Sequence, residues 1–319
     1  MDVTTGLVNV QLLGPLSVRV SNQTVTPTAA KQRKIMALLA LNIGRVVTVP
    51  MLTEELWDGD PPATSVTTLQ TYIVQLRKRL TSALPAHSAA QGFISTRHSG
   101  YLLQEATCQT DIAEFDAIAR RGRAAAESGD YRAASELLSC ALELWRGSAF
   151  ADIPAGRILE IEAICLEERR LGILERRIGV DLALNRHIDL LGELRLLTAK
   201  HPMSENLAGF LMIALYRSGY VGRALEEFQR LRAVLRADLG IEPSPRLKQL
   251  QKAILVRDPA LEAEDLLTAD RPGATVPAPV VCWQITASDR TAQEDRAGDL
   301  SPGGRRQKAS ARRDIPGGG

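Results

Sequence analysis

The stretch from Ala63 to Thr81 combines side chains that could bind nucleic acid. Five apolar residues recur there at steps of three and four, which places them on one face of a predicted helix: Val66, Leu69, Ile73, Leu76 and Leu80. The remaining faces carry short polar and basic groups: Thr67, Thr68, Thr71, Gln75, Arg77 and Lys78. Hydroxyl and amide groups suit base edges, and basic groups suit phosphates. The pattern indicates a recognition helix for duplex DNA. Arg79 ranks below its neighbours because it can turn toward the helix flank.

A predicted hairpin follows this helix. Residues 93–104, FISTRHSGYLLQ, have the pattern of a strand, a polar turn and a second strand, with Gly100 available for a positive φ. Arg97 and His98 lie in the turn and are candidate DNA contacts. A recognition helix followed by a β wing is one way in which proteins hold duplex DNA.

The residues upstream predict the elements that position the helix and the hairpin. Alternating apolar residues in 7–28 predict short strands, AAKQRKIMALLALN at 29–42 predicts a helix, and Thr48 caps a shorter helix that ends at Trp57. The first of these helices carries Lys31, Arg33 and Lys34, which are candidate contacts to the DNA backbone. Together the elements predict a winged helix-turn-helix domain with an extra N-terminal sheet over residues 1–104.

The rest of the chain is predicted to be almost unbroken helix. Antiparallel pairs are indicated at 111–127 with 131–146 and at 203–217 with 221–238, and two further helices at 157–184 and 187–200. Repeated helical hairpins suggest a tetratricopeptide-like (TPR-like) all-α domain over 111–257 that presents a groove to another protein. An irregular bundle that serves only as a dimerisation scaffold is the alternative. Proline and glycine predict a disordered tail at 258–319. The predicted fold class is mainly α with a small β component.

Charge and motifs exclude several function classes. The 319-residue chain has a formal net charge of +2, and its positive excess lies in residues 1–100, with 9 Lys and Arg against 5 Asp and Glu. We expect a cytoplasmic, nucleoid-associated protein without membrane contact, because no apolar run or signal peptide is evident. Four scattered cysteines form no metal motif. No nucleophile elbow, HExxH or phosphate-binding loop occurs, so neither an enzyme nor a cofactor is expected.

One ordered set of segments runs through the chain: LLGPLSV, KQRKIMALLALNIGRVV, ELWDGDPPATSVTTLQTYIVQLRKRL, RHSGYLL, DIAEFDAIA, ALELWRG and HPMSENLAGFLMIALYRSGYVGRALEEFQRLRAVLRADLGIEP. This set closely resembles the SARP-type transcriptional activators, the antibiotic regulatory proteins of actinomycetes. These regulators join an OmpR-like winged helix to a bacterial transcriptional activation domain. The resemblance covers about residues 7–257 and supports both predicted domains.

The resemblance implies a sequence-specific activator that binds direct repeats at promoters, as a homodimer on DNA. It also implies that the protein helps to recruit RNA polymerase holoenzyme, usually for a secondary-metabolite gene cluster. By position, the recognition helix is Ala63–Thr81, the wing turn is Arg97–Gly100, and the polymerase-facing loop falls near Asp58–Pro62. Tyr220 and Phe228 depart from residues that are frequent in the family. A TPR-like helical adaptor without sequence-specific DNA binding is the alternative, and salt-sensitive binding to one promoter sequence would distinguish the two.

Overall fold

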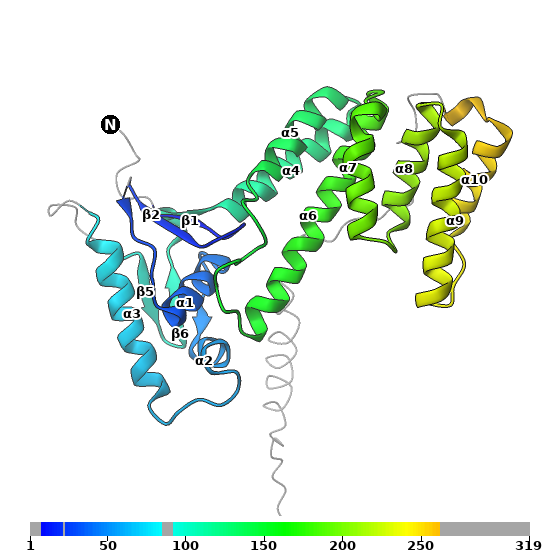
Figure 1. Cartoon of the computed structure of the whole chain (residues 1–319). Helices are drawn as coiled ribbons and strands as arrows, with labels where there is room; N and C mark the ends of the chain where they lie inside the picture. The colour runs from blue at the N-terminus through cyan, green and yellow to red at the C-terminus, as the bar shows by residue number, and fades with distance from the viewer. Residues whose placement is uncertain (1–7, 22, 85–91, 262–319) are drawn as a thin grey trace, which may run out of the picture. The chain divides into compact units, whose positions relative to one another are not determined.

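The computed structural model describes residues 8–21, 23–84 and 92–261, all within one compact unit. The N-terminal part is a winged helix with a preceding sheet, and the part that follows is helical (Figure 1). The predicted fold class, mainly α with a small β component, is therefore confirmed. The elements of the N-terminal part are β1 (Val8–Gln11), β2 (Ser17–Val20), β3 (Gln23–Thr24), α1 (Ala30–Leu41), β4 (Val47–Thr48), α2 (Val49–Trp57), α3 (Ser65–Thr81), β5 (Ile94–Arg97), β6 (Gly100–Leu103), the 3₁₀ helix Glu105–Thr107 and β7 (Cys108–Thr110).

Two small sheets flank the three helices of the N-terminal part. The first has the order β3-β2-β1-β7, with β1 antiparallel to β2 and parallel to β7. The second has the order β4-β6-β5 and contains the wing. The sequence did not predict β4 or β7, because segments of two and three residues are too short to show alternation. Since β7 pairs with β1, the N-terminal sheet takes a strand from beyond residue 104.

The predicted cap of α2 and the predicted apolar face of α3 are both present, with one exception on α3. Thr48 accepts a hydrogen bond from the backbone N–H of Met51 and so caps α2 as expected. On α3, the four residues from Leu69 to Leu80 that share the apolar face are buried. Val66 was predicted to join them, but it is 49% exposed. It lies at the edge of the buried face, where Ser65 turns inward in its place.

The helical part begins directly after β7. Its helices are α4 (Asp111–Glu127), α5 (Tyr131–Glu143), α6 (Arg157–Ala183), α7 (His187–Lys200), α8 (Glu205–Arg217), α9 (Val221–Asp238) and α10 (Pro245–Val256). α4 packs on α5, and α8 packs on both α7 and α9. The turns of the two predicted hairpins contain Gly129 and Gly219, both with positive φ, as helix ends favour. Helix α10 was not predicted, although Ser244 followed by proline is a typical helix start.

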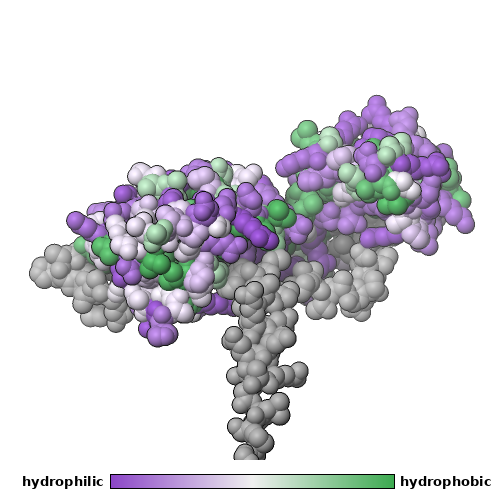
Figure 2. All heavy atoms as spheres, turned by 90° about the horizontal axis from the view of Figure 1, so that it is seen from below, coloured by the Kyte–Doolittle hydropathy of each residue, from purple (hydrophilic) through white to green (hydrophobic). Residues whose placement is uncertain are grey.

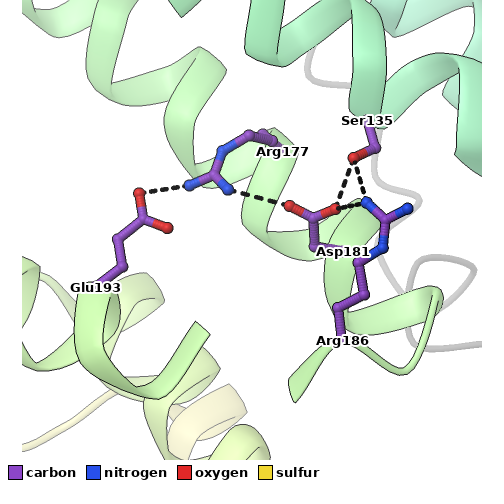
Figure 3. Close-up of polar contacts among 5 residues, drawn as sticks. All are labelled: Ser135, Arg177, Asp181, Arg186 and Glu193. Carbon is purple, nitrogen blue, oxygen red and sulfur yellow. Dashed lines mark hydrogen bonds and ion pairs between the residues drawn. The ribbon is translucent and has the colours of Figure 1, made fainter. Parts of the chain in front are cut away.

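Two apolar cores share the long helix α6. The first core joins the winged-helix part to α4, α5 and most of α6, and the second core joins the end of α6 to α7–α10. Between them lies a polar cluster around Asp181, which is 4% exposed (Figure 3). Its carboxylate accepts hydrogen bonds from Ser135 Oγ of α5 at 2.6 Å, from Arg177 at 3.0 Å and from Arg186 at 3.0 Å. Arg177 also binds Glu193 of α7, so the cluster ties three successive helices together.

The packed chain continues slightly beyond the predicted start of the tail. Pro259–Leu261 forms a 3₁₀ turn whose Leu261 side chain is buried in the second core, and the Leu261 carbonyl accepts a hydrogen bond from Arg217. The predicted disorder of the remainder concerns residues 262–319, which lie outside the described residues. Within the described residues no helix is long and apolar enough to cross a membrane. Figure 2 shows a face on which hydrophilic residues predominate and hydrophobic residues gather in small patches.

Candidate nucleic-acid interface

The solvent-facing side of α3 carries a row of residues opposite its buried face. Thr67, Thr71, Val74 and Lys78 are exposed and follow one another at steps of four, three and four, the same spacing as the buried leucines and isoleucine two positions later. Thr71 donates a hydrogen bond from Oγ1 to the carbonyl of Thr67 at 3.0 Å, which fixes its side chain against the helix. Three of the predicted contact residues therefore share one exposed surface. Thr68 is only partly exposed, at the edge of this row.

The wing presents two more of the predicted residues. β5 and β6 are joined by a two-residue turn, and Arg97 and His98 are exposed there. Gly100 was expected to supply a positive φ, but it is not among the residues with positive φ. A Cβ atom at Gly100 would lie 2.0 Å from the carbonyl oxygen of Val47, so glycine is required because β4 passes so close.

Arg77 links the recognition helix to the wing. Its Nε donates to the carbonyl of Ile94 at 2.9 Å, and its Nη2 donates to Thr96 Oγ1 at 2.8 Å, both on β5. The guanidinium group therefore holds β5 beside α3 (Figure 1). Arg77 was predicted to contact phosphate, whereas its position makes it first of all a support for the wing.

Three further residues lie on the flanks of α3 and α1. Gln75 is exposed, but its Oε1 accepts a hydrogen bond from Gln32 of α1, which turns it away from the row. Arg79 donates to the carbonyl of Thr26 at 3.1 Å, in agreement with its lower ranking. Lys31 stacks over the ring of Trp57 at 4.4 Å, so its ammonium group is held at the α1–α2 side of the domain.

Two predicted contacts, Arg33 and Lys34, do not present free charged groups to a phosphate in this structure, contrary to the expectation from the sequence. Both side chains are largely buried. Arg33 forms an ion pair with Asp152 from the helical part, and Lys34 donates to the backbone carbonyl of Glu55 at 2.8 Å. Buried cations require such partners, and these partners hold both groups inside the molecule.

Glu55 of α2 connects the winged-helix part to the start of α6. Its carboxylate is fully buried and accepts hydrogen bonds from the backbone N–H groups of Gly156 at 2.6 Å, Ile158 at 3.0 Å and Leu159 at 3.1 Å. These N–H groups are the ones that a helix N-terminus leaves without an intrahelical partner. Burial raises the pKa of Glu55, while the three N–H groups and Lys34 act in the opposite direction.

Two aspartates of the helical part make similar connections to the winged-helix part, across the border between the two. Asp111, at the start of α4, accepts hydrogen bonds from the backbone N–H groups of Leu12 and Leu13 at 2.8–2.9 Å. Asp152 accepts one from Leu16 at 2.8 Å. Three carboxylates thus bind main-chain groups across the border, and they fix the winged-helix part to the helical part.

The loop between α2 and α3 contains the predicted polymerase-facing segment. Residues 58–62 are exposed, and the chain turns there through positive φ at Asp58 and Gly59. A groove of about 510 Å³ lies beside the loop and is lined by residues of α2, of the loop and of the start of α3, together with Arg157 of α6.

Three exposed residues of α3 were not among the predicted DNA contacts: Val66, Gln70 and Val74. The prediction rested on residue type and favoured hydroxyl, amide and basic side chains. A helical wheel centred opposite the buried leucines would have found Val74, with Gln70 at its margin, because it selects by position and not by residue type. Val66 lies closer to the buried face, and no such wheel selects it.

Comparisons with known proteins identify both parts of the chain. The family described as "Transcriptional regulatory protein, C terminal" matches residues 23–103, and the "Bacterial transcriptional activator domain" matches residues 110–255. The regulatory protein DnrI of Streptomyces peucetius is 47% identical over 271 residues, which are 84% of this chain and 97% of DnrI. The transcriptional regulator RedD of Streptomyces coelicolor is 34% identical over 82% of this chain and 74% of RedD.

A solved structure shares the arrangement. Mycobacterium tuberculosis EmbR, determined in complex with a low-affinity phosphopeptide, superposes with a TM-score of 0.75 at 31% identity, over 82% of this chain and 69% of that chain. The order of the two matched domains and the near full-length match to DnrI show that the chain belongs to the SARP family, the antibiotic regulators of actinomycetes that act on transcription.

Proposed function

We propose that this protein is a sequence-specific DNA-binding activator that inserts α3 into the major groove and rests the β5–β6 wing on the adjacent backbone. The observation that carries the proposal is the exposed row on α3. It places two threonine hydroxyls and Lys78 on one surface, opposite the buried face of the helix. An α-helix fits the major groove, where hydroxyl groups can contact base edges.

The charge of the interface supports the same proposal. Residues 65–81 contain three basic side chains and no acidic ones. Lys78 and Arg97 are exposed and suited to phosphates, and His98 lies beside Arg97 in the wing turn. Arg77 holds the wing in register with α3, and Thr67 and Thr71 are the residues that we assign to base contacts, with Thr68 and Gln75 at the margins.

The finer features of the function rest on family membership. We propose that two copies bind direct repeats at a promoter as a homodimer, and that the bound protein helps to recruit RNA polymerase to an antibiotic biosynthesis cluster. The exposed loop at residues 58–62 and the groove beside it offer a surface for the polymerase. Direct repeats place both wings in the same orientation, so their spacing should matter by whole turns of about 10–10.5 bp.

The DNA-binding proposal is tested with duplexes that the full-length protein selects from a randomised library. Affinity is measured by fluorescence anisotropy at several salt concentrations for the wild type, Lys78→Ala and Arg97→Ala. Lys252→Ala is the matched control, because Lys252 is exposed on α10, far along the sequence from α3. Each of the first two variants should weaken binding and reduce the salt slope by about one unit for each phosphate that is no longer neutralised. The control should behave as the wild type does.

Equal affinities and slopes for all three variants would refute the assigned interface. A protein that selects no sequence and binds every duplex alike would favour the helical adaptor instead. The activation step is tested separately with Asp60→Lys, which reverses an exposed charge in the α2–α3 loop. This variant should occupy its site normally and lose transcription from a reporter promoter.

A further inference from the structure

An exposed valine occupies the centre of the DNA-facing row. Val74 is 60% exposed and lies on α3 between Thr71 and Lys78, one turn of helix from each. Val66 lies two turns before it, 49% exposed, and is displaced by about 80° around the helix axis at roughly 100° per residue. Val74 therefore lies within the exposed row formed by Thr67, Thr71 and Lys78, whereas Val66 lies at the edge of the buried face and lines the groove beside the α2–α3 loop.

Valine is poorly suited to such a position unless it contacts a partner. Its β-branched side chain lowers helix propensity relative to alanine, lysine or glutamine, and its apolar surface gains nothing from water. The surroundings indicate what the partner is. Three basic residues and no acidic ones lie on α3, and Arg97 is exposed on the neighbouring wing, so the surface is complementary to a polyanion.

The apolar feature of a DNA major groove is the C5 methyl group of pyrimidines. Thymine always carries this methyl, and cytosine carries it only when the DNA is methylated. Small apolar side chains contact it, and the contact distinguishes T·A from other base pairs. Val74 can contact such a methyl group while the neighbouring Lys78 contacts a phosphate.

We propose that Val74 is a specificity-determining residue that contacts a thymine methyl in the major groove. The inference rests on the proposed DNA-binding function and extends it from the helix to one chemical group of the operator. Each recognition site should therefore contain a thymine whose replacement by cytosine or uracil lowers the affinity.

The test removes the methyl group from each side of the contact in turn. A duplex selected by the wild-type protein is prepared with thymine, with uracil in place of thymine, and with 5-methylcytosine in place of cytosine. Affinity for each duplex is measured for the wild type, Val74→Ala and Val256→Ala. Alanine is the better helix former, so Val74→Ala should fold, and its circular dichroism and thermal melt check this. Val256 is a matched control because it is 65% exposed at the end of α10.

We expect uracil to weaken wild-type binding by about fourfold for each contacted methyl group that is removed, the worth of one buried methylene. Val74→Ala should lose a similar factor on the thymine duplex and should lose little more on the uracil duplex, since the contact is already gone. Val256→Ala should lose the same factor of affinity as the wild type when uracil replaces thymine. Replacement of cytosine by 5-methylcytosine should leave the affinity unchanged.

Two results would overturn the inference while leaving the proposed function intact. One is salt-sensitive, selective binding in which the wild type and Val74→Ala lose the same factor on uracil substitution. The other is a requirement for 5-methylcytosine, which would assign the methyl to modified cytosine. Failure of the wild type to bind any selected duplex would overturn the proposed function, and this inference with it.

Discussion

Replacing Glu55 with alanine should loosen the border between the winged-helix part and the helical part. The carboxylate is fully buried and receives three backbone N–H groups from the start of α6 at 2.6–3.1 Å. Alanine would remove the acceptor that these groups share, and a buried N–H group without an acceptor costs free energy. Lys34 would keep its bond to the backbone carbonyl of residue 55 and lose the nearby charge at 3.9 Å.

The magnitude follows from these contacts. A hydrogen bond to a charged group contributes about 1.5–3 kcal/mol, and the three are not additive because they share one carboxylate. Removing one member of a buried charged pair typically costs about 3–5 kcal/mol. We therefore expect Glu55→Ala to lower the free energy of unfolding by roughly 3–5 kcal/mol. Glu55→Gln keeps one acceptor but turns an NH₂ group toward N–H donors, so it should lower the free energy as well, by a smaller amount.

The assay is urea unfolding followed by tryptophan fluorescence, with Trp57 on α2 and Trp145 beyond α5 as probes on the two sides of the border. Glu54→Ala is the matched control, because Glu54 is the exposed neighbour on the same helix, and it should change stability by less than about 0.5 kcal/mol. Equal unfolding midpoints for the Glu55 and Glu54 variants would refute the view that this carboxylate holds the border.

Three further predictions concern stability. Glu162 is buried with its Oε1 unpartnered, and burial raises its pKa, so the folded protein binds this proton more tightly than the unfolded chain does. Stability should therefore fall as pH rises from 4.5 through the raised pKa, and Glu162→Gln should melt higher than the wild type at pH 7 but not below pH 4.5. Gly100→Ala should destabilise the wing by about 1–3 kcal/mol in urea melts, because its Cβ would meet the β4 carbonyl at 2.0 Å, whereas Gly92→Ala, with 3.7 Å of space, should not. Asp181→Ala should cost about 1–3 kcal/mol, because it removes the acceptor of Ser135 and Arg186 while Arg177 keeps Glu193, and unchanged thermal melts would contradict that role.

The sequence predicted the elements that depend on local pattern. α3, the wing and the helical hairpins each show a clear period or a turn signal, and the structure has them close to the expected bounds. The sequence also placed Thr67, Thr71 and Lys78 off the apolar face of the helix, and the structure exposes all three. β7 is too short for any period, and its place beside β1 depends on pairing across the chain, as Val8 with Cys108.

The basic residues whose surroundings the sequence could not predict have distant partners. Arg33 and Lys34 are basic residues of the kind found on DNA-binding faces. Arg33 instead pairs with Asp152, and Lys34 donates to the backbone carbonyl of Glu55. Arg77 has the type and position of a phosphate contact, yet two bonds to β5 give it a supporting role. Local spacing carries no information on such pairs, because the partner is chosen by the packing of the whole chain.

Because β1 pairs with β7, the N-terminal sheet can be completed only after residue 110 has been synthesised. Val8 pairs with Cys108, which is synthesised 100 residues later. At a synthesis rate of roughly 5–20 residues per second, β1 therefore remains without β7 for about 5–20 s. The hydrogen bonds of Glu55 form later still, because their donors begin at Gly156. During that interval β1 has an unpaired edge that could pair with another nascent chain. The winged-helix part thus finishes folding only after the ribosome has delivered the start of the helical part.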